Sequence, residues 1–240
     1  PTIKRSRSHD YVSKEVINVR ENVGLIEVAN FSKHEFKGPD ARKFLDHIMA
    51  GRLPKPGRIS LSPMLSYRGK LCGDLTVACL DENEFMVFGS GAAQEMHRRW
   101  FESHLDKFNL SYSNRSDEYH GLSIAGPNSR KVLEKIVRDD VSNEKFKFRD
   151  SRRMFVGGVP AIINRISFTG ELGYEIYVAP HYQLKLYEEL MEAGKEFNIK
   201  PFGGRALMSM RLEKNWGAWT LDYRPDFTAK ETGLDAFINW

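Results

Sequence analysis

The sequence has little cysteine, no long apolar run and no large excess of either charge. Its two cysteines, Cys72 and Cys79, lie seven residues apart in one expected strand, so their side chains point to opposite faces and no disulfide is expected between them. So few cysteines are typical of a reducing compartment. No apolar stretch approaches the roughly 20 residues of a membrane span, and the basic N-terminus PTIKRSRSHDY lacks the apolar segment of a secretory signal.

Signals for metal, nucleotide and nucleic-acid binding are missing too. The seven histidines show no ligand spacing, so no metal is predicted, and lone ones such as His47 and His97 are interpreted as surface or core-edge residues. No Gly-x-Gly-x-x-Gly follows a strand and no Gly-Lys-Ser/Thr loop occurs, which leaves a nucleotide site unsupported. The 36 basic and 32 acidic residues are interspersed, so the net charge of +4 favours a mixed solvated surface over a nucleic-acid patch.

What the sequence does contain is an internal repeat. KGPDARKFLDHI, from Lys37 to Ile48, matches AGPNSRKVLEKI, from Ala125 to Ile136, at a constant offset of 88. In each copy Gly-Pro ahead of Asp or Asn predicts a helix start, and a strand precedes it, GLIEVANFSKHEFKG in one and YHGLSIAG in the other. Further along, CGDLTVACL and EFMVFGSG lead into a predicted helix over 92–108, and FTGELGYEIYVAP leads into one over about 182–196.

This pattern predicts an α+β fold of two interleaved, pseudo-repeated units with antiparallel sheets and flanking helices. Hairpin-length connections such as CLDENEF argue against a doubly wound parallel sheet. The expected division is an N-terminal arm and first strand over 1–30, a first unit over 31–120 and a second over 121–240, intertwined into one module. The start at Pro1 without Met and the apolar end GLDAFINW indicate a segment of a longer polypeptide.

Two strands carry the carboxylates of interest. In RISFTGELGYEIYV, alternation puts Tyr174 on one face and Gly173, Glu175 and Tyr177 on the other, so that face either closes a core edge or forms a pocket wall with an acceptor for N–H donors.

In LSYRGKLCGDLTVACL, Asp74 follows a glycine at a strand entrance, and we expect Glu171 to hold the matching place in the second repeat. A lone Asp there is more often a turn residue. No Ser-His-Asp or Cys-His arrangement is visible, so a substrate that brings its own nucleophile is expected.

Four segments together resemble the glycine-cleavage T-protein (aminomethyltransferase) superfamily: VRENVGLIEVANFSKHEFKGPDARKFLD, RGKLCGDLTV, SFTGELGYEIYV and GGRALMSMRLEKNWGAW. The last is most similar to the folate-binding half of dimethylglycine and sarcosine dehydrogenases. The resemblance implies a flavin domain before Pro1 and a small β domain after Trp240.

The resemblance also implies site residues. Asp74 matches the catalytic aspartate beside the folate amines, and Glu175 the pterin-binding glutamate, which would accept adjacent N–H donors. The further folate-binding candidates are Phe168, Tyr174, Arg205, Met64, Leu65 and Ser90. Simpler structural roles stay open for some of these: a turn contact for Glu171, an ion pair with Glu213 for Arg205, and core packing for Met64. Lys70 in place of a glycine and Phe168 in place of a tyrosine depart from the family pattern.

The function so implied is a tetrahydrofolate-dependent aminomethyl transferase module. It would capture an imine from dimethylglycine- or sarcosine-like methylamine oxidation, or from glycine cleavage, and form 5,10-methylenetetrahydrofolate. FAD would belong only to the missing upstream domain, with which contact is possible, and no nucleic-acid or membrane partner is expected. The implied compartment is the cytoplasm in bacteria and the mitochondrial matrix in eukaryotes. The alternative is a non-catalytic folate-fold module kept for interaction or assembly.

Overall fold

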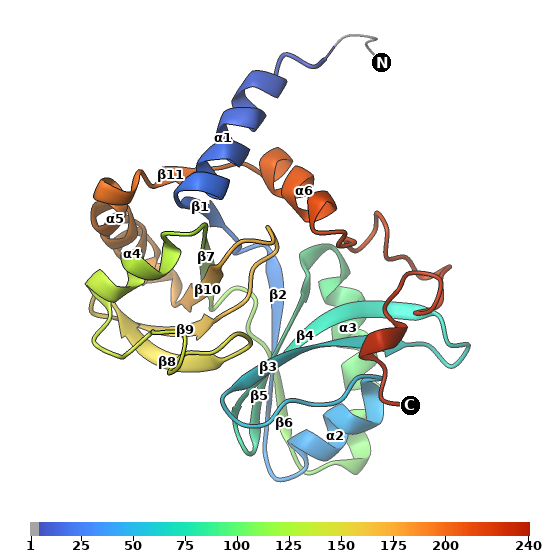
Figure 1. Ribbon diagram of the computed structural model, residues 1–240. Coiled ribbons are helices and arrows are strands. Elements are labelled where there is room, and N and C mark those ends of the chain that lie inside the picture. The colour runs from blue at the N-terminus through green and yellow to red at the C-terminus, as the bar shows by residue number, and fades with distance from the viewer. Residues whose placement is uncertain (1–4) are drawn as a thin grey trace. The chain divides into compact units, whose positions relative to one another are not determined.

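The computed structural model describes residues 5–240, which form two compact units (Figure 1). The first unit takes residues up to 28 together with 120–148 and 153–216, and the second takes 29–119, 149–152 and 217–240. The chain therefore passes repeatedly from one unit to the other, which confirms the predicted interleaving. The predicted three-part division stays a prediction, and the first four residues of its arm lie outside the described part.

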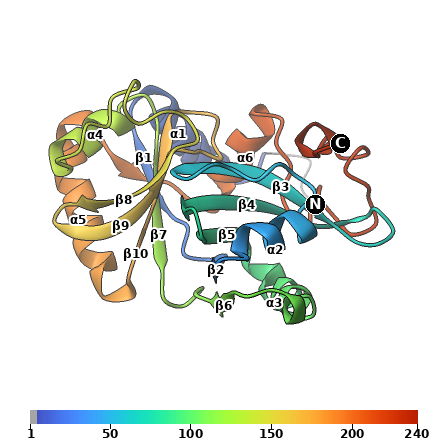
Figure 2. The ribbon, with the colours of Figure 1, turned by 90° about the horizontal axis from the view of Figure 1, so that it is seen from below.

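The first unit is built on a six-stranded sheet in the order β11-β1-β7-β10-β9-β8. Helices α4 and α5 pack together on one face of this sheet (Figure 2), and α1 and α6 pack on the other. The strands are β1 (Gly24–Glu27), β7 (His120–Ala125), β8 (Ser151–Val156), β9 (Val159–Asn164), β10 (Gly173–Val178) and β11 (Lys200–Pro201). The helices are α1 (His9–Glu21), α4 (Ser129–Ile136), α5 (Gln183–Gly194) and α6 (Gly204–Glu213).

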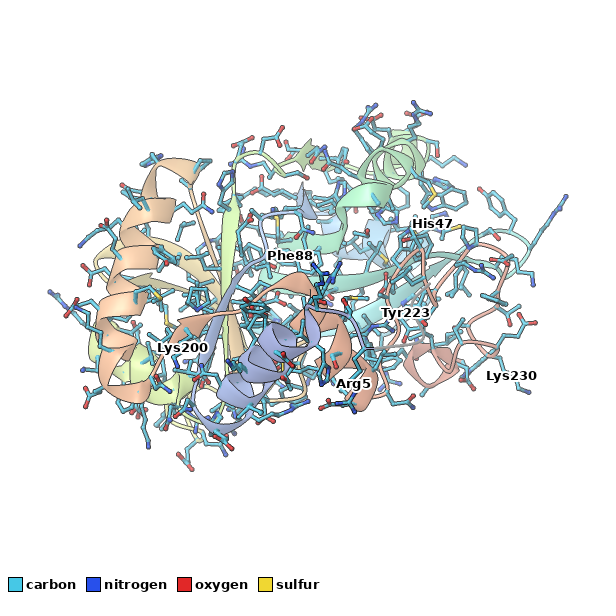
Figure 3. All side chains as sticks on the ribbon, turned by 90° about the horizontal axis from the view of Figure 1, so that it is seen from above. Arg5, His47, Phe88, Lys200, Tyr223 and Lys230 are labelled. Atoms are coloured by element: carbon cyan, nitrogen blue, oxygen red, sulfur yellow. The ribbon has the colours of Figure 1, made fainter. Side chains whose placement is uncertain are left out.

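The second unit is built on a five-stranded antiparallel sheet in the order β3-β4-β5-β2-β6. Its apolar core, in which Phe36, Phe44 and Phe101 are fully buried, lies between the sheet and the helices α2 and α3. Figure 3 labels Phe88 on β5 and His47 on α2. The elements are β2 (Phe31–Lys37), α2 (Ala41–Ile48), β3 (Arg58–Leu65), β4 (Leu71–Asp81), β5 (Glu84–Ser90), α3 (Gln94–Glu102) and β6 (Ser111–Asn114).

The two sheets repeat the same plan, because the order β6-β2-β5-β4-β3 corresponds to β1-β7-β10-β9-β8. Helices α2 and α4 follow β2 and β7, and α3 and α5 follow β5 and β10. The prediction of a single strand over 24–38 was wrong, because this segment forms two strands in different sheets. Strand β1 pairs with β7, and β2 pairs with β5. Alternation within a strand cannot reveal that its two ends pair with different partners.

Two helical boundaries also differ from the sequence patterns. The helix expected over 92–108 is shorter, because α3 spans Gln94–Glu102 and is flanked by single 3-10 turns. Helix α1 was not predicted. Its sequence HDYVSKEVINVRE is largely polar, and its apolar stripe is limited to Val12, Val16 and Val19, which pack beside α6.

The Gly-Pro pairs before α2 and α4 have a backbone reason. Gly38 has φ 138° and Gly126 has φ 134°, a conformation that L side chains rarely adopt. An added Cβ at Gly126 would lie 2.5 Å from the carbonyl oxygen of Asn22 and 2.6 Å from that of Val19. The repeated glycine therefore lets the strand turn into the helix against neighbouring backbone.

We expect Gly126→Ala to lower the free energy of unfolding by roughly 1 to 3 kcal/mol, since backbone neighbours cannot move aside as side chains do. The control is Gly204→Ala at the start of α6, where no atom lies within 4 Å of an added Cβ and alanine is a better helix former. Urea denaturation of both variants measures the effect. Equal stability of the two variants would contradict this account.

Candidate functional site

Glu175 stands at the middle of β10 on the face opposite the main core of the first unit. Its cross-strand neighbours are Ser123 on β7 and Asn164 on β9, so three polar side chains form a buried row across the sheet. The hydroxyl of Tyr177, two residues along the same face, donates to Oε2 of Glu175 at 2.9 Å. Strand alternation thus placed Glu175 beside an aromatic residue correctly.

Burial controls the ionisation of this carboxyl. It raises the pKa of Glu175 to about 7, while the hydrogen bond from Tyr177 and the charge of Lys214 act in the opposite direction. Lys214 follows α6, and its Nζ donates to the carbonyl oxygen of Ser167 at 2.9 Å. Among residues 5–240 the structure shows one side-chain donor to Glu175, the phenol of Tyr177, on Oε2. No hydrogen bond from residues 5–240 reaches Oε1, which leaves this oxygen available to a donor of a ligand.

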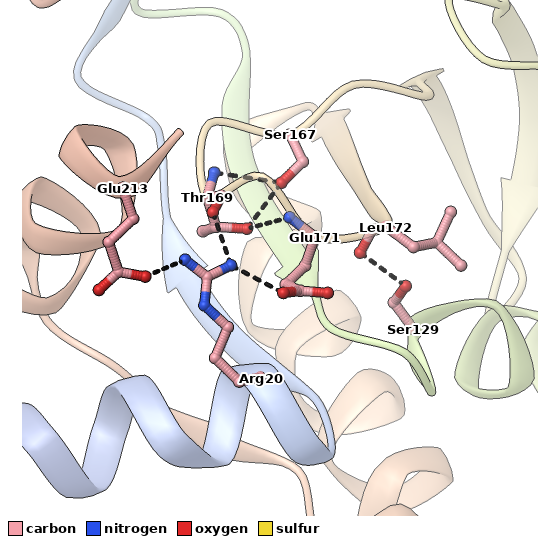
Figure 4. A network of polar contacts seen from close by, with 7 residues as sticks. All are labelled: Arg20, Ser129, Ser167, Thr169, Glu171, Leu172 and Glu213. Carbon is pink, nitrogen blue, oxygen red and sulfur yellow. Dashed lines mark hydrogen bonds and ion pairs between the residues drawn. The ribbon is translucent and has the colours of Figure 1, made fainter. Parts of the chain in front are cut away.

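The turn before β10 is fixed by a polar network (Figure 4). Nη1 of Arg20 on α1 donates to the carbonyl oxygen of Thr169 at 3.0 Å and to Oε1 of Glu171 at 2.7 Å, and Nη2 donates to Oε2 of Glu213 at 2.6 Å. Inside the turn, the hydroxyls of Ser167 and Thr169 are 2.8 Å apart. Glu171 is thus a structural residue that ties the turn to α1 and thereby sets where β10 begins.

The structure corrects two sequence-based interpretations here. Glu171 does not match Asp74, because Asp74 lies on β4, whose counterpart in the first unit is β9, whereas Glu171 precedes β10, the counterpart of β5. Glu213 pairs with Arg20 rather than with Arg205, which donates to Oγ of Ser8 at 2.7 Å. Both errors arose from matching residues by local sequence, without the strand order.

Asp74 lies near the start of β4, opposite Pro63 on β3, on the face away from the core of the second unit. The side chain is half-buried, and this burial raises the pKa of Asp74 to about 7. Its own backbone N–H acts in the opposite direction and lowers the pKa of this carboxyl. A carboxyl group so placed can accept and return a proton near neutral pH.

His97 supports the backbone next to Asp74, a role that the sequence did not predict. Its Nε2 lies 2.9 Å from the carbonyl oxygen of Cys72, and since a carbonyl only accepts, this nitrogen carries the proton. The ring is buried, contrary to the surface or core-edge interpretation, and an added Cβ at Gly73 would lie 2.8 Å from Nε2. The absence of a side chain at Gly73 therefore leaves room for the ring of His97 against β4.

Three further candidates do not lie beside Glu175 or Asp74 on the same face of their sheets. Tyr174 points into the core of the first unit, where its ring stacks on Phe146 at 5.9 Å, so it does not share the face of Glu175. Met64 is fully buried in the core of the second unit, on the face opposite Asp74. Arg205 is exposed on α6.

Three other candidates lie at strand ends or in the turn. Continuing the pairing of Thr76 with Phe88 by two residues puts Ser90 across from Asp74. Leu65 ends β3 beside a register shift, and Phe168 is half-buried in the turn before β10.

Lys70, the departure from the family pattern, has its own partner. Its Nζ lies 3.6 Å from Oε2 of Glu231, and its backbone pairs with Thr228.

Residues 5–240 contain no group of three metal-ligating His, Cys, Asp or Glu side chains. None of the helices in this range combines the length and hydropathy needed to cross a membrane. Both cysteines are free thiols.

The raised pKa of Glu175 makes stability depend on pH. The folded state holds this proton up to about pH 7 and the unfolded state releases it near 4.5, so the group's contribution to stability falls as pH rises through this window. We expect Glu175→Gln, which cannot ionise, to gain roughly 3 kcal/mol relative to the wild type between pH 4.5 and 7.5. Urea denaturation across this range tests it, with the exposed Glu192→Gln as control. A constant difference would show that Glu175 titrates at its ordinary value.

The chain is similar in sequence and in fold to known proteins. The family model described as the GCVT N-terminal domain matches residues 2–240. Mitochondrial dimethylglycine dehydrogenase of Mus musculus is 36% identical over 99% of this chain and 28% of its own length. An aminomethyltransferase of Thermoanaerobacter pseudethanolicus is 28% identical over 92% of this chain and 61% of its own. The crystal structure of the glycine cleavage aminomethyltransferase T of Bartonella henselae superposes with a TM-score of 0.81 at 24% identity, covering 91% of this chain and 58% of that one. The chain thus spans less than two thirds of these relatives.

Proposed function

The chain belongs to the GCVT N-terminal domain family, and on that premise we propose that it is a tetrahydrofolate-dependent one-carbon transferase module. Its reaction joins an imine-level carbon to tetrahydrofolate and gives 5,10-methylenetetrahydrofolate. The imine comes from oxidation of a methylamine of the dimethylglycine or sarcosine type, by a flavin-containing part of a longer enzyme. The observation that carries the proposal is the buried Glu175 of the first unit, whose pKa is raised to about 7 and whose Oε1 receives no hydrogen bond from residues 5–240. In the second unit, the half-buried Asp74 also has a pKa raised to about 7.

Glu175 binds the ligand and takes no part in bond making. A pterin edge presents adjacent N–H donors, and a carboxylate accepts them through charge-assisted hydrogen bonds. The open Oε1 and the buried surroundings of Glu175 fit this ligand, since a buried acceptor gains most from a donor that replaces lost water. Of the other predicted folate-binding residues, we propose Phe168 in the turn before β10 and Ser90 at the end of β5 as further ligand contacts, on the family resemblance alone.

Asp74 moves the proton. One folate amine adds to the carbon of the protonated imine (iminium), a C–N bond forms as the C=N π electrons move to the iminium nitrogen, and Asp74 accepts the proton that the folate nitrogen releases. The donor amine then leaves with the proton returned by Asp74. The second folate amine closes the methylene bridge and releases its own proton to solvent. No electrons are exchanged in this sequence, and a carboxyl with a pKa near 7 suits both directions of transfer.

Calorimetric titration of this chain with tetrahydrofolate tests the function, beside an assay of methylenetetrahydrofolate formation when an amine-oxidising flavoenzyme supplies the imine. We expect saturable binding of one folate and capture of the carbon. A chain that binds folate without capturing carbon would favour the non-catalytic module, and a chain that binds none would remove the folate function.

A further inference from the structure

The ring of Tyr177 packs over a position on β7 where only glycine leaves room for it. Its Cα partner on β7 is Gly121, and its ring lies over that glycine: an added Cβ at Gly121 would be 2.7 Å from Cε1 and 2.9 Å from Cδ1 of Tyr177. The ring is fully buried. The missing side chain at Gly121 thus lets the ring lie flat against the sheet with its hydroxyl directed along the strand to Glu175.

We propose that Tyr177 is a positioning residue for Glu175: its hydroxyl fixes the orientation of the carboxylate, favours the ionised form, and leaves Oε1 to the ligand. This inference rests on the proposed folate function for the identity of the ligand. A glutamate side chain has three rotatable bonds, so without a fixed partner its two oxygens would exchange places. With Oε2 accepting the phenol at 2.9 Å, one lone pair of that oxygen is committed, and no residue of the described range donates to Oε1.

The surroundings leave Tyr177 as the main hydrogen-bond donor to this carboxylate. The neighbouring strands contribute uncharged Ser123 and Asn164, and α6 contributes Lys214, which attracts the carboxylate by charge and whose Nζ donates to Ser167. Arg20 on α1 and Glu213 on α6 pair with each other. The phenol itself stays protonated, because burial raises the pKa of Tyr177 well above its ordinary value.

The ligand's N–H groups need the ionised carboxylate, so affinity for tetrahydrofolate should rise with pH up to the pKa of Glu175 and then level off. Removing the phenol in Tyr177→Phe withdraws a hydrogen bond that favours the ionised form. We therefore expect the midpoint of the affinity-versus-pH curve to move upward by roughly half to one pH unit, with the affinity above pH 8.5 changed by less than about threefold.

The experiment is calorimetric titration of this chain with tetrahydrofolate between pH 6 and 9, with Tyr182→Phe as the matched control. Tyr182 packs at the edge of the core of the same unit, and its variant should keep the wild-type midpoint. Equal weakening at every pH, or an unchanged midpoint, would overturn the inference. Gly121→Ala provides a second variant, since it keeps the phenol but displaces the ring, and it should move the midpoint in the same direction.

A folate-independent measurement separates this inference from the proposed function. The carbon-13 shift of the Glu175 carboxyl, assigned by its loss in Glu175→Gln, reports its pKa directly. We expect a value near 7 in the wild type and a higher one in Tyr177→Phe. If the wild type binds no folate while the carboxyl titration still shifts, the folate function fails and the role of Tyr177 stands. If the titration does not shift, the role of Tyr177 fails whatever the ligand.

Discussion

Glu175→Gln is expected to weaken tetrahydrofolate binding by about 10- to 150-fold at pH 8, which corresponds to roughly 1.5 to 3 kcal/mol. The charge that strengthens the hydrogen bonds is lost, and the amide has a single acceptor oxygen. If that oxygen keeps the hydrogen bond from Tyr177, the amide N–H groups face the N–H groups of the ligand. An N–H donor of the amide then faces an N–H donor of the ligand in a buried site, and neither has an acceptor.

Calorimetry at pH 8 measures this loss, and Glu192→Gln on the exposed face of α5 is the control. Unfolding does not explain a loss of binding, because Glu175→Gln is expected to be at least as stable as the wild type above pH 7. The loss should be smaller in a Tyr177→Phe background, where the amide oxygen is released to the ligand. Unchanged affinity in the single variant would leave Glu175 a structural residue of β10.

The parts of this site that were predictable from the sequence are those set by local periodicity. Alternation along β10 placed Glu175 and Tyr177 on one face and Tyr174 on the other, and the structure agrees. The Gly-Pro repeats marked α2 and α4, because φ near 135° at Gly38 and Gly126 demands glycine. Each of these signals acts within a few residues.

The parts that were not predictable depend on partners far apart in the chain. Arg20 and Glu171 are separated by 151 positions and carry no mutual signal. Strand β1 precedes β2 in the chain but pairs with β7, and β6 precedes β7 but pairs with β2. The alternation of residues along a strand does not show which strand it pairs with. The role of His97 was not predicted for the same reason, since it depends on Gly73 and the carbonyl oxygen of Cys72 in another element.

Asp74→Asn is expected to keep most of the folate binding and to lose the transfer step. The amide retains the volume and one acceptor oxygen, whereas it cannot accept the proton released as the folate amine attacks. Contributions of a general base typically span about 10²- to 10⁴-fold in rate.

The measurement supplies the imine from a methylamine through an amine-oxidising flavoenzyme in the presence of tetrahydrofolate, and compares methylenetetrahydrofolate with free formaldehyde. The wild type should direct the carbon to folate, while Asp74→Asn should release it as formaldehyde, because an uncaptured imine hydrolyses. Asp81→Asn, at the exposed far end of the same strand, is the control and should match the wild type. If Asp74→Asn binds folate and partitions its carbon like the wild type, then Asp74 is a strand residue without a catalytic role, and the base must be sought among the ligand's own amines.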